Sequence, residues 1–320
     1  METQPHAAII ERIQESVSRV IVGKEEVIRL LLTALIAQGH VLLEDVPGTG
    51  KTMLAKSLAR SIDASFSRIQ FTPDLLPSDV TGLNYYNQKE GAFRFRQGPV
   101  FANILLADEI NRATPRTQSS LLECMEERQV TIDGETRPLA APFFVIATQN
   151  PVETAGTFPL PEAQMDRFLM QLSMGFPTPD EELLILNRFL GGSPYAQVDP
   201  VCSGQDITAL SKASLNVYLH PHLMEYMVAL VQGTRDNANV LLGVSPRGSL
   251  ALSRAVRAYA LVNGRDYVVP EDIKALAVPV LAHRIVMPGM PGIAGGRETG
   301  ASLIEKLLSQ VPVPTEDWRR

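Results

Sequence analysis

The chain has 320 residues, of which 45% are hydrophobic and 20% are charged, and its formal net charge is −6. These values describe a soluble globular protein that is long enough for two domains, each with its own core, and they exclude a global basic field that would hold nucleic acid or acidic lipid. Cys124 and Cys202 are too few for a disulfide framework and lack metal-ligand spacing, so we expect both to be reduced in a cytoplasmic protein.

Two helices are predicted at the start of the chain. Ile9, Ile13 and Val17 fall at helical spacing, and a second helix runs through Gln38 after a break at 22–23. The first residues show no signal-peptide pattern, and no run reaches the roughly 18 uncharged apolar residues of a membrane span. We therefore expect no membrane span.

A glycine-rich turn then joins the apolar run at 41–43 to a helix that begins near Lys51. Such a turn points backbone N–H groups at a phosphate, and the positive end of the next helix adds to the attraction. Lys51 is expected to reach the β- and γ-phosphates, and the Thr52 hydroxyl to hold Mg²⁺. Asp45 stands where the usual pattern has glycine, and a chance glycine-rich turn is the alternative. The residues expected to bind the nucleotide are Val46, Pro47, Gly48, Thr49, Gly50, Lys51, Thr52 and Met53.

Apolar runs alternate with helices through the first half of the chain, which predicts a parallel sheet buried on both faces. The strands are expected near 40–44, 66–71, 102–107, 143–148 and 169–173, and helices are expected to begin near Lys51, Thr114 and Pro161.

Two hairpins interrupt this alternation. One spans about 84–98, and the other spans 129–137, where Asp133-Gly134 predicts a type I′ turn. A βαβ core needs neither hairpin. They are candidates for contact with a partner or substrate, and surface decoration without a role is the alternative.

A pair of acidic residues, Asp108 and Glu109, ends the apolar run at 103–107. Carboxylates at the end of a buried strand are costly to desolvate unless something uses them. Beside a nucleotide, Asp108 would bind the Mg²⁺ shell and Glu109 would polarise the attacking water. The alternative is a helix cap.

Two further polar residues lie next to predicted strands. Asn150 follows the strand at 143–148, where ligands of parallel sheets bind, and its amide is a candidate to position the water. A simple Asn-Pro turn is the alternative. Arg167 precedes the strand at 169–173 and is a candidate arginine finger for a neighbouring subunit, or half of a structural salt bridge.

The pattern changes after residue 190. Glycine and proline at 191–194 and 199–200 mark a linker, and the following residues are helical, most clearly at 223–231, 247–262 and 271–281. A loop is expected at 287–296 and a last helix at 301–308. These features predict an α/β domain over 1–192 and a small all-helical domain over 200–320.

Arg247 is expected at the start of a helix, because Ser245-Pro246 gives an N-cap and a first helical position. From there it is a candidate to bridge the second domain to the phosphates held by the first.

Several motifs in register resemble those of the MoxR-type AAA+ ATPases, and the similarity runs from about residue 22 to 285. The motifs are Gly48-Thr49-Gly50-Lys51-Thr52, Asp108-Glu109-Ile110-Asn111-Arg112, Ala147-Thr148-Gln149-Asn150-Pro151, Pro161 to Phe168 and Ser245-Pro246-Arg247. The resemblance implies an α/β P-loop AAA+ core with helices on both faces of a parallel sheet, followed by a helical lid.

It also implies a ring, usually a hexamer, with ATP and Mg²⁺ between subunits. Asn150 would be the first sensor, Arg167 the finger that acts in trans, and Arg247 the second sensor. Arg112 and Arg116 resemble subunit-interface residues. The hairpins match the insertions of the clade that includes magnesium chelatase and replicative helicase motors.

The function that the resemblance implies is ATP hydrolysis coupled to chaperone-like work on other proteins, such as metal or cofactor insertion or maturation of a complex. Partners of this family often carry a von Willebrand factor A type domain. A nucleic-acid motor is the alternative, although the first hairpin offers only Lys89, Arg94 and Arg96, with Glu90 opposing. A third possibility is a nucleotide-binding regulator that hardly turns over, against which Glu109 and Asn150 argue.

Overall fold

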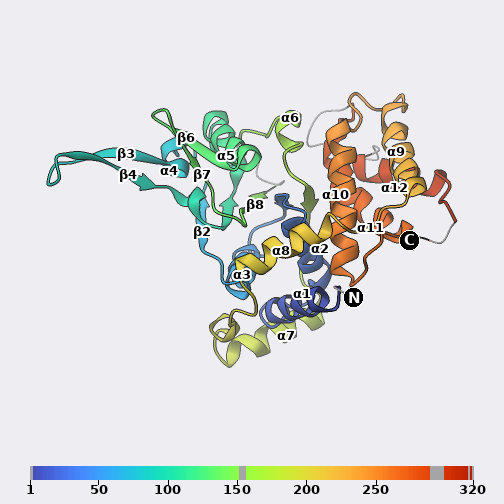
Figure 1. The fold of residues 1–320 in the computed structure, drawn as a ribbon, viewed down its shortest axis with the longest axis horizontal. Coiled ribbons are helices and arrows are strands. Elements are labelled where there is room, and N and C mark those ends of the chain that lie inside the picture. Colours follow the sequence, from blue (N-terminus) through green and yellow to red (C-terminus); the bar gives the residue numbers. More distant parts are fainter. Residues whose placement is uncertain (1–2, 151–155, 289–298, 316–317, 319–320) are drawn as a thin grey trace.

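The computed structural model of the chain describes residues 3–150, 156–288, 299–315 and 318. An α/β part with a central sheet lies beside a helical lid, and a long hairpin projects from the side away from the lid (Figure 1). Within the described residues, no helix has the length and apolar character needed to cross a bilayer.

The central sheet has five strands in the order β2-β5-β8-β1-β9, and all its pairs are parallel. Their bounds are Val41–Glu44 for β1, Phe66–Gln70 for β2, Ile104–Asp108 for β5, Phe144–Gln149 for β8 and Met170–Leu172 for β9. The five predicted strands and the parallel sheet are therefore confirmed. Because the strands are parallel, the segments that follow them meet at one edge of the sheet.

Helices cover both faces of this sheet, as expected. Successive strand residues point to opposite faces, so Val41 and Leu43 join one apolar cluster while Leu42 joins the other. The helices of this part are α1 (Thr3–Ser18), α2 (Glu25–Ile36), α3 (Lys51–Ser61), α4 (Pro77–Thr81), α5 (Pro115–Glu127), α6 (Glu162–Met165) and α7 (Pro179–Leu190), with 3₁₀ turns η1 (Pro99–Phe101) and η2 (Ile110–Arg112).

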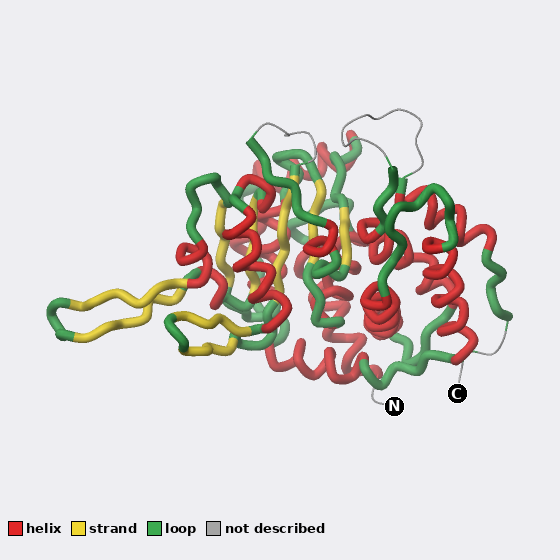
Figure 2. Tube along the Cα trace, turned by 90° about the horizontal axis from the view of Figure 1, so that it is seen from above, coloured by secondary structure: helices red, strands yellow, loops and turns green. Residues whose placement is uncertain are grey.

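Both predicted hairpins form. The first pairs β3 (Gly82–Asn87) with β4 (Ala92–Gln97) and projects far from the sheet, and the second pairs β6 (Gln129–Ile132) with β7 (Glu135–Pro138) (Figures 1 and 2). Asp133 and Gly134 have φ values of 50° and 83°, which is the left-handed pair that a type I′ turn requires.

The lid is helical, as predicted, and its described residues add only two isolated β-bridges to the helices. Its elements are η3 (Pro194–Gln197), α8 (Gly204–Ser214), α9 (Pro221–Arg235), α10 (Pro246–Val262), α11 (Pro270–Leu281), η4 (Ala282–Arg284) and α12 (Gly300–Gln310). Most of the loop predicted at 287–296 lies outside the described residues.

The prediction of a separate core for each domain is wrong. One apolar cluster runs without interruption from Ile10 and Leu31 through the sheet residue Ile146 to Leu252 and Leu307 in the lid. The reason is that the side chains of α1 and α2 are buried against α10 as well as against the sheet. A smaller cluster, which includes Leu122 and Val145, fills the other face of the sheet.

Candidate nucleotide-binding site

The glycine-rich turn leaves β1 and enters α3, as the sequence predicts. Gly48 and Gly50 have φ values of 87° and 92°, a left-handed conformation that favours glycine. The Lys51 ammonium donates hydrogen bonds to the carbonyl oxygens of Asp45 and Val46, at 3.1 and 2.9 Å. Its side chain therefore lies back across the loop.

The side chain of Asp45 accepts hydrogen bonds from three consecutive residues, which explains why a carboxylate stands at this position of the loop. Its carboxylate accepts hydrogen bonds from the backbone N–H groups of Met174 and Gly175, at 2.5 and 3.1 Å, and from the Ser173 hydroxyl at 3.1 Å. Asp45 is buried. It thus ties the start of the loop to the segment that leads from β9 to α7.

Asp108 and Glu109 lie at the same edge of the sheet as the loop. The Thr148 hydroxyl donates to Asp108 Oδ1 at 2.6 Å and accepts from the Glu109 N–H at 2.8 Å. Glu109 has φ 55° and ψ 51°. Because β8 lies between β5 and β1, Asn150, which is buried, follows β8 between the acidic pair and the loop.

Two residues of β2 contact the acidic pair, and the sequence analysis did not single them out. Arg68 Nη2 lies 2.6 Å from Asp108 Oδ2, and Gln70 Nε2 donates to Glu109 Oε2 at 2.7 Å. Arg112 also pairs with Glu109, at 3.0 Å. The available signal was that Arg68 and Gln70 are polar residues near the carboxyl end of a predicted strand.

The residues expected to hold Mg²⁺ supply the right kind of atoms. Thr52 offers a hydroxyl and Asp108 a carboxylate, and Mg²⁺ prefers oxygen ligands. In the described part of the chain, no group of three or more His, Cys, Asp or Glu could hold a metal alone. This fits an ion bound through one or two protein oxygens together with substrate phosphates. Asp108 must release Arg68 to contact such an ion directly.

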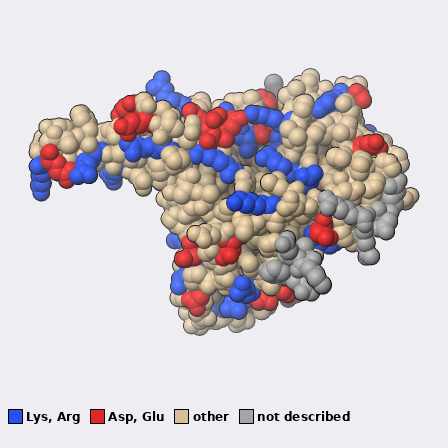
Figure 3. Space-filling model, viewed as in Figure 1, with Lys and Arg blue, Asp and Glu red and all other residues tan. Residues whose placement is uncertain are grey.

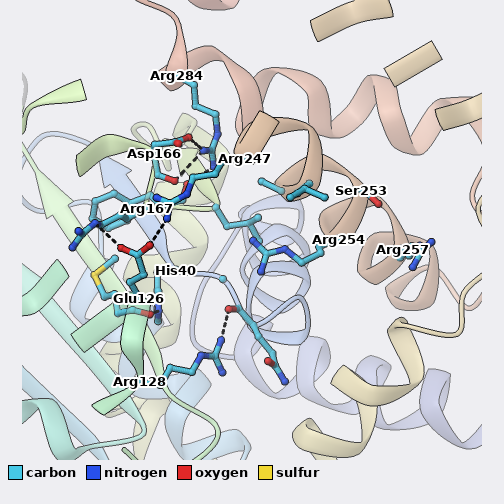
Figure 4. A pocket seen from close by; sticks show the side chains of 17 residues that line it. His40, Glu126, Arg128, Asp166, Arg167, Arg247, Ser253, Arg254, Arg257 and Arg284 are labelled. Atoms are coloured by element: carbon cyan, nitrogen blue, oxygen red, sulfur yellow. Dashed lines mark hydrogen bonds and ion pairs between the residues drawn. The ribbon is translucent and has the colours of Figure 1, made fainter. Parts of the chain in front are cut away.

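Arg167 and Arg247 lie at the opposite edge of the sheet. They line a cavity of about 600 Å³ together with residues 38–40, which precede β1, and residues 166–169, which precede β9. Arg167 Nε lies 3.2 Å from the Glu126 carboxylate, and Arg247 pairs with the same carboxylate (Figure 4). On the face of the molecule that Figure 3 shows, Lys and Arg side chains are prominent over the hairpins and across the middle.

The bridge that Arg247 was expected to make from the second domain to the phosphates held by the first domain is therefore not formed in this structure. The loop follows the carboxyl end of β1, whereas Arg247 lies beyond the amino end of the same strand. The sequence could not reveal this, because the capping signal Ser245-Pro246 that places Arg247 at the start of α10 says nothing about the edge of the sheet to which α10 packs. Arg116 is exposed in the first turn of α5.

Comparisons with known proteins agree with this fold. The profile of the ATPase family associated with various cellular activities (AAA) matches residues 40–170, and that of the AAA lid domain matches residues 232–307. The chain is 52% identical over 302 residues to the protein YeaC of Bacillus subtilis, covering 94% of each chain. It is 45% identical over 287 residues to the protein named Chaperone MoxR1 of Mycobacterium tuberculosis, covering 87% of this chain and 76% of that protein. A crystal structure of a protein from Cytophaga hutchinsonii matches with a TM-score of 0.89 and 40% identity, covering 98% of this chain and 97% of that one.

Proposed function

Because the chain belongs to the MoxR family of AAA+ ATPases, we propose that it hydrolyses ATP with Mg²⁺ and uses the cycle to remodel or assemble partner proteins in the cytoplasm. The observation that carries this proposal is the arrangement at one edge of the sheet. The P-loop, the Asp108-Glu109 pair and Asn150 follow three adjacent strands, β1, β5 and β8. An ATP phosphate chain held by the loop amides would reach all of them.

Three side chains must change partners in the proposed reaction, and the first is Asp108, which releases Arg68. Lys51 leaves the carbonyls of Asp45 and Val46 to bind the β- and γ-phosphates, and Glu109 leaves Gln70 to polarise the attacking water. Thr52 and Asp108 would hold Mg²⁺, which neutralises charge on the phosphates when it is bound.

Arg167 and Arg247 then belong to the site of a neighbouring copy. Both lie beyond the amino ends of the strands, so a head-to-tail ring would set them against the nucleotide of the next subunit. A guanidinium in this position stabilises charge on the transferring phosphoryl group and contributes roughly 10³–10⁵ in rate. We propose a closed ring, a hexamer by family resemblance, with Arg112 and Arg116 at its interface.

Mixing two inactive variants tests this arrangement. Lys51→Ala removes nucleotide binding but keeps both arginines, whereas Arg167→Ala keeps the P-loop but removes the finger. Each alone should release phosphate at about 1% of the wild-type rate or less. Equal amounts together should recover a measurable fraction, because Arg167 of one subunit then meets an intact P-loop of the next.

The matched control replaces Arg29, a half-buried arginine that pairs with Glu26 and does not line the cavity. Arg29→Ala should keep wild-type activity alone. Mixtures that stay as inactive as their parts would show that the finger does not act between subunits, and wild-type protein that releases no phosphate from ATP with Mg²⁺ would refute the hydrolytic function itself.

The first hairpin supports work on protein partners. Near its tip, Tyr86 and Phe93 are 55% and 73% exposed, with their ring centroids 5.4 Å apart. Such an exposed aromatic pair suits an apolar protein surface. Clients with a von Willebrand factor A type domain are the class we propose. In a Glu109→Gln background, which should trap ATP, Phe93→Ser should reduce client capture and leave ATP binding unchanged.

A nucleic-acid motor is the second candidate, and the basic side chains along the first hairpin favour it (Figure 3). It ranks lower because Arg94 is already paired with Glu90 at 2.5 Å. ATP hydrolysis that DNA stimulates, with an effect that falls steeply with salt, would reverse this order.

A further inference from the structure

The cavity at the amino edge of the sheet is much more cationic than a nucleotide finger requires. Its described lining includes six arginines and two carboxylates. Both carboxylates already have partners, since Glu126 pairs with Arg167 and Arg247, and Asp166 pairs with Arg284. The remaining three, Arg128, Arg254 and Arg257, form the group that we call the inner arginines.

The described part of the chain supplies no carboxylate for the inner arginines. Arg128 donates to the Gln38 carbonyl oxygen at 2.6 Å. Arg254 has no hydrogen-bond or ion-pair partner among the described residues, and the Nε of Arg257 is buried without an acceptor. In Figure 4 the Arg254 guanidinium points into the cavity, with Arg128 across from it.

Electrostatics make this arrangement unfavourable without an anion. Partial burial lowers the pKa of Arg128 and of Arg254, and the charge of Arg254 lowers that of Arg128 further. His40 in the cavity wall adds no charge near neutral pH, because burial lowers its pKa to about 4. Charged groups that have left water need a counter-charge.

We infer that the inner arginines bind a small anion with two or more phosphate groups, at a site separate from the catalytic nucleotide. Guanidinium groups fit phosphate oxygens with two parallel hydrogen bonds, and a polyvalent anion can engage several at once. A single carboxylate would leave most of the positive charge unbalanced.

The spacing along α10 separates this site from the finger. Arg247, Arg254 and Arg257 lie seven and ten residues apart on one helix, which is roughly 10 and 15 Å along its axis. Arg254 and Arg257 also line a second, smaller cavity with Ser211 and Ser214. The inner site can therefore be filled whether or not Arg167 and Arg247 engage a neighbour's ATP, and it does not depend on hydrolysis.

Pyrophosphate is the probe, and isothermal titration is the measurement. The Lys51→Ala variant is used throughout, because it removes the P-loop as a competing phosphate site in every copy. We expect this variant to bind pyrophosphate. Adding Arg254→Gln should weaken binding about tenfold or more, and Arg128→Gln should do the same. Arg254→Gln should not lower the melting temperature of the empty protein, since it removes a repelling charge and no hydrogen bond.

Two controls keep the result specific. Arg29→Gln, in α2 and outside the cavity lining, should leave pyrophosphate binding unchanged, and so should Arg167→Ala. The inference fails if Lys51→Ala does not bind pyrophosphate or if Arg254→Gln binds it equally well. It also fails if binding is lost with Arg167→Ala, which would identify the neighbour's nucleotide phosphates as the ligand. Loss of self-association in Arg254→Gln without pyrophosphate binding would assign these arginines to a protein interface instead.

Discussion

Asp45 is a carboxylate that anchors the glycine-rich loop, the candidate nucleotide-binding loop, to the segment that follows β9. Its three hydrogen bonds come from residues 173–175, so its replacement leaves buried N–H groups without an acceptor. We expect Asp45→Gly, although it restores the common loop pattern, to lower the free energy of unfolding by about 1–3 kcal/mol. Urea denaturation measures this. Asp199→Asn, at an exposed position, is the control, and equal stability of the Gly variant and wild type would contradict the anchor.

His40 makes stability depend on pH. Its Nδ1 accepts from the Val145 N–H at 3.0 Å, and its Nε2 lies 3.0 Å from the Met125 carbonyl oxygen. Burial lowers its pKa from 6.5 to about 4. Between these values the unfolded chain binds a proton that the folded chain does not, so stability is complete above pH 6.5 and falls as the pH drops toward 4.

The expected contribution of His40 is a loss of about 2 kcal/mol between pH 7.5 and pH 5. Urea unfolding at the two pH values measures it. In His40→Gln the absolute stability falls, but this part of the pH dependence should disappear. In His222→Gln, at an exposed position, it should remain. A pH dependence that is the same in His40→Gln as in wild type would contradict the assignment.

The position of a site residue was predictable from the sequence where that residue lies at or just after the end of a predicted strand. Lys51, Asp108 and Asn150 could be placed at one edge because parallel strands bring their carboxyl ends together. The side-chain partners in the structure could not be predicted. Pairs such as Gln70 with Glu109, or Glu126 with Arg247, depend on how distant segments of the chain pack together.

At the level of elements, strands and hairpins were predictable and α7 was not. Buried parallel strands are short apolar runs, and Asp133-Gly134 specifies its own turn. By contrast, α7 buries none of its residues, all of which are described. Its apolar side chains, Leu183 and Leu186 among them, are exposed, and Thr178 caps its start through the Glu181 N–H.

The exposure of α7 leads to a prediction about stability. Leu186, which is 57% exposed, should tolerate Leu186→Gln in dilute protein with a change in unfolding free energy of less than about 0.5 kcal/mol. Leu252→Ala, on the buried side of α10, should cost about 2–5 kcal/mol. Urea denaturation of the two variants makes the comparison. A large loss for Leu186→Gln would show that α7 is covered in solution.

At the scale of the whole molecule, the lid and the α/β part share one apolar core. The apolar cluster that spans Ile10 to Leu307 connects the two parts. A buried cation, Arg284, which is 7% exposed, adds polar contacts between them. Arg284 donates to the carbonyl oxygens of Asp166 and Phe168, at 2.9 and 2.6 Å, and it pairs with the Asp166 carboxylate. Asp166 also accepts from Ser245 at the start of α10. The lid thus fixes the residue next to Arg167.

Arg284→Gln should therefore affect stability and catalysis together. Loss of the charge leaves Asp166 without its cation and should cost about 3 kcal/mol in unfolding free energy. Unfolding should remain a single transition, because the apolar cluster is continuous. Arg167 loses its fixed neighbour, so phosphate release should fall about 10- to 100-fold, while ATP binding at the P-loop is retained.

Arg265 and Asp272 form a comparable ion pair within the lid. Arg265→Gln is thus the matched control, which should lose stability and keep its rate per folded molecule. Equal loss of rate in both variants would mean that instability, rather than the position of Arg167, causes the effect.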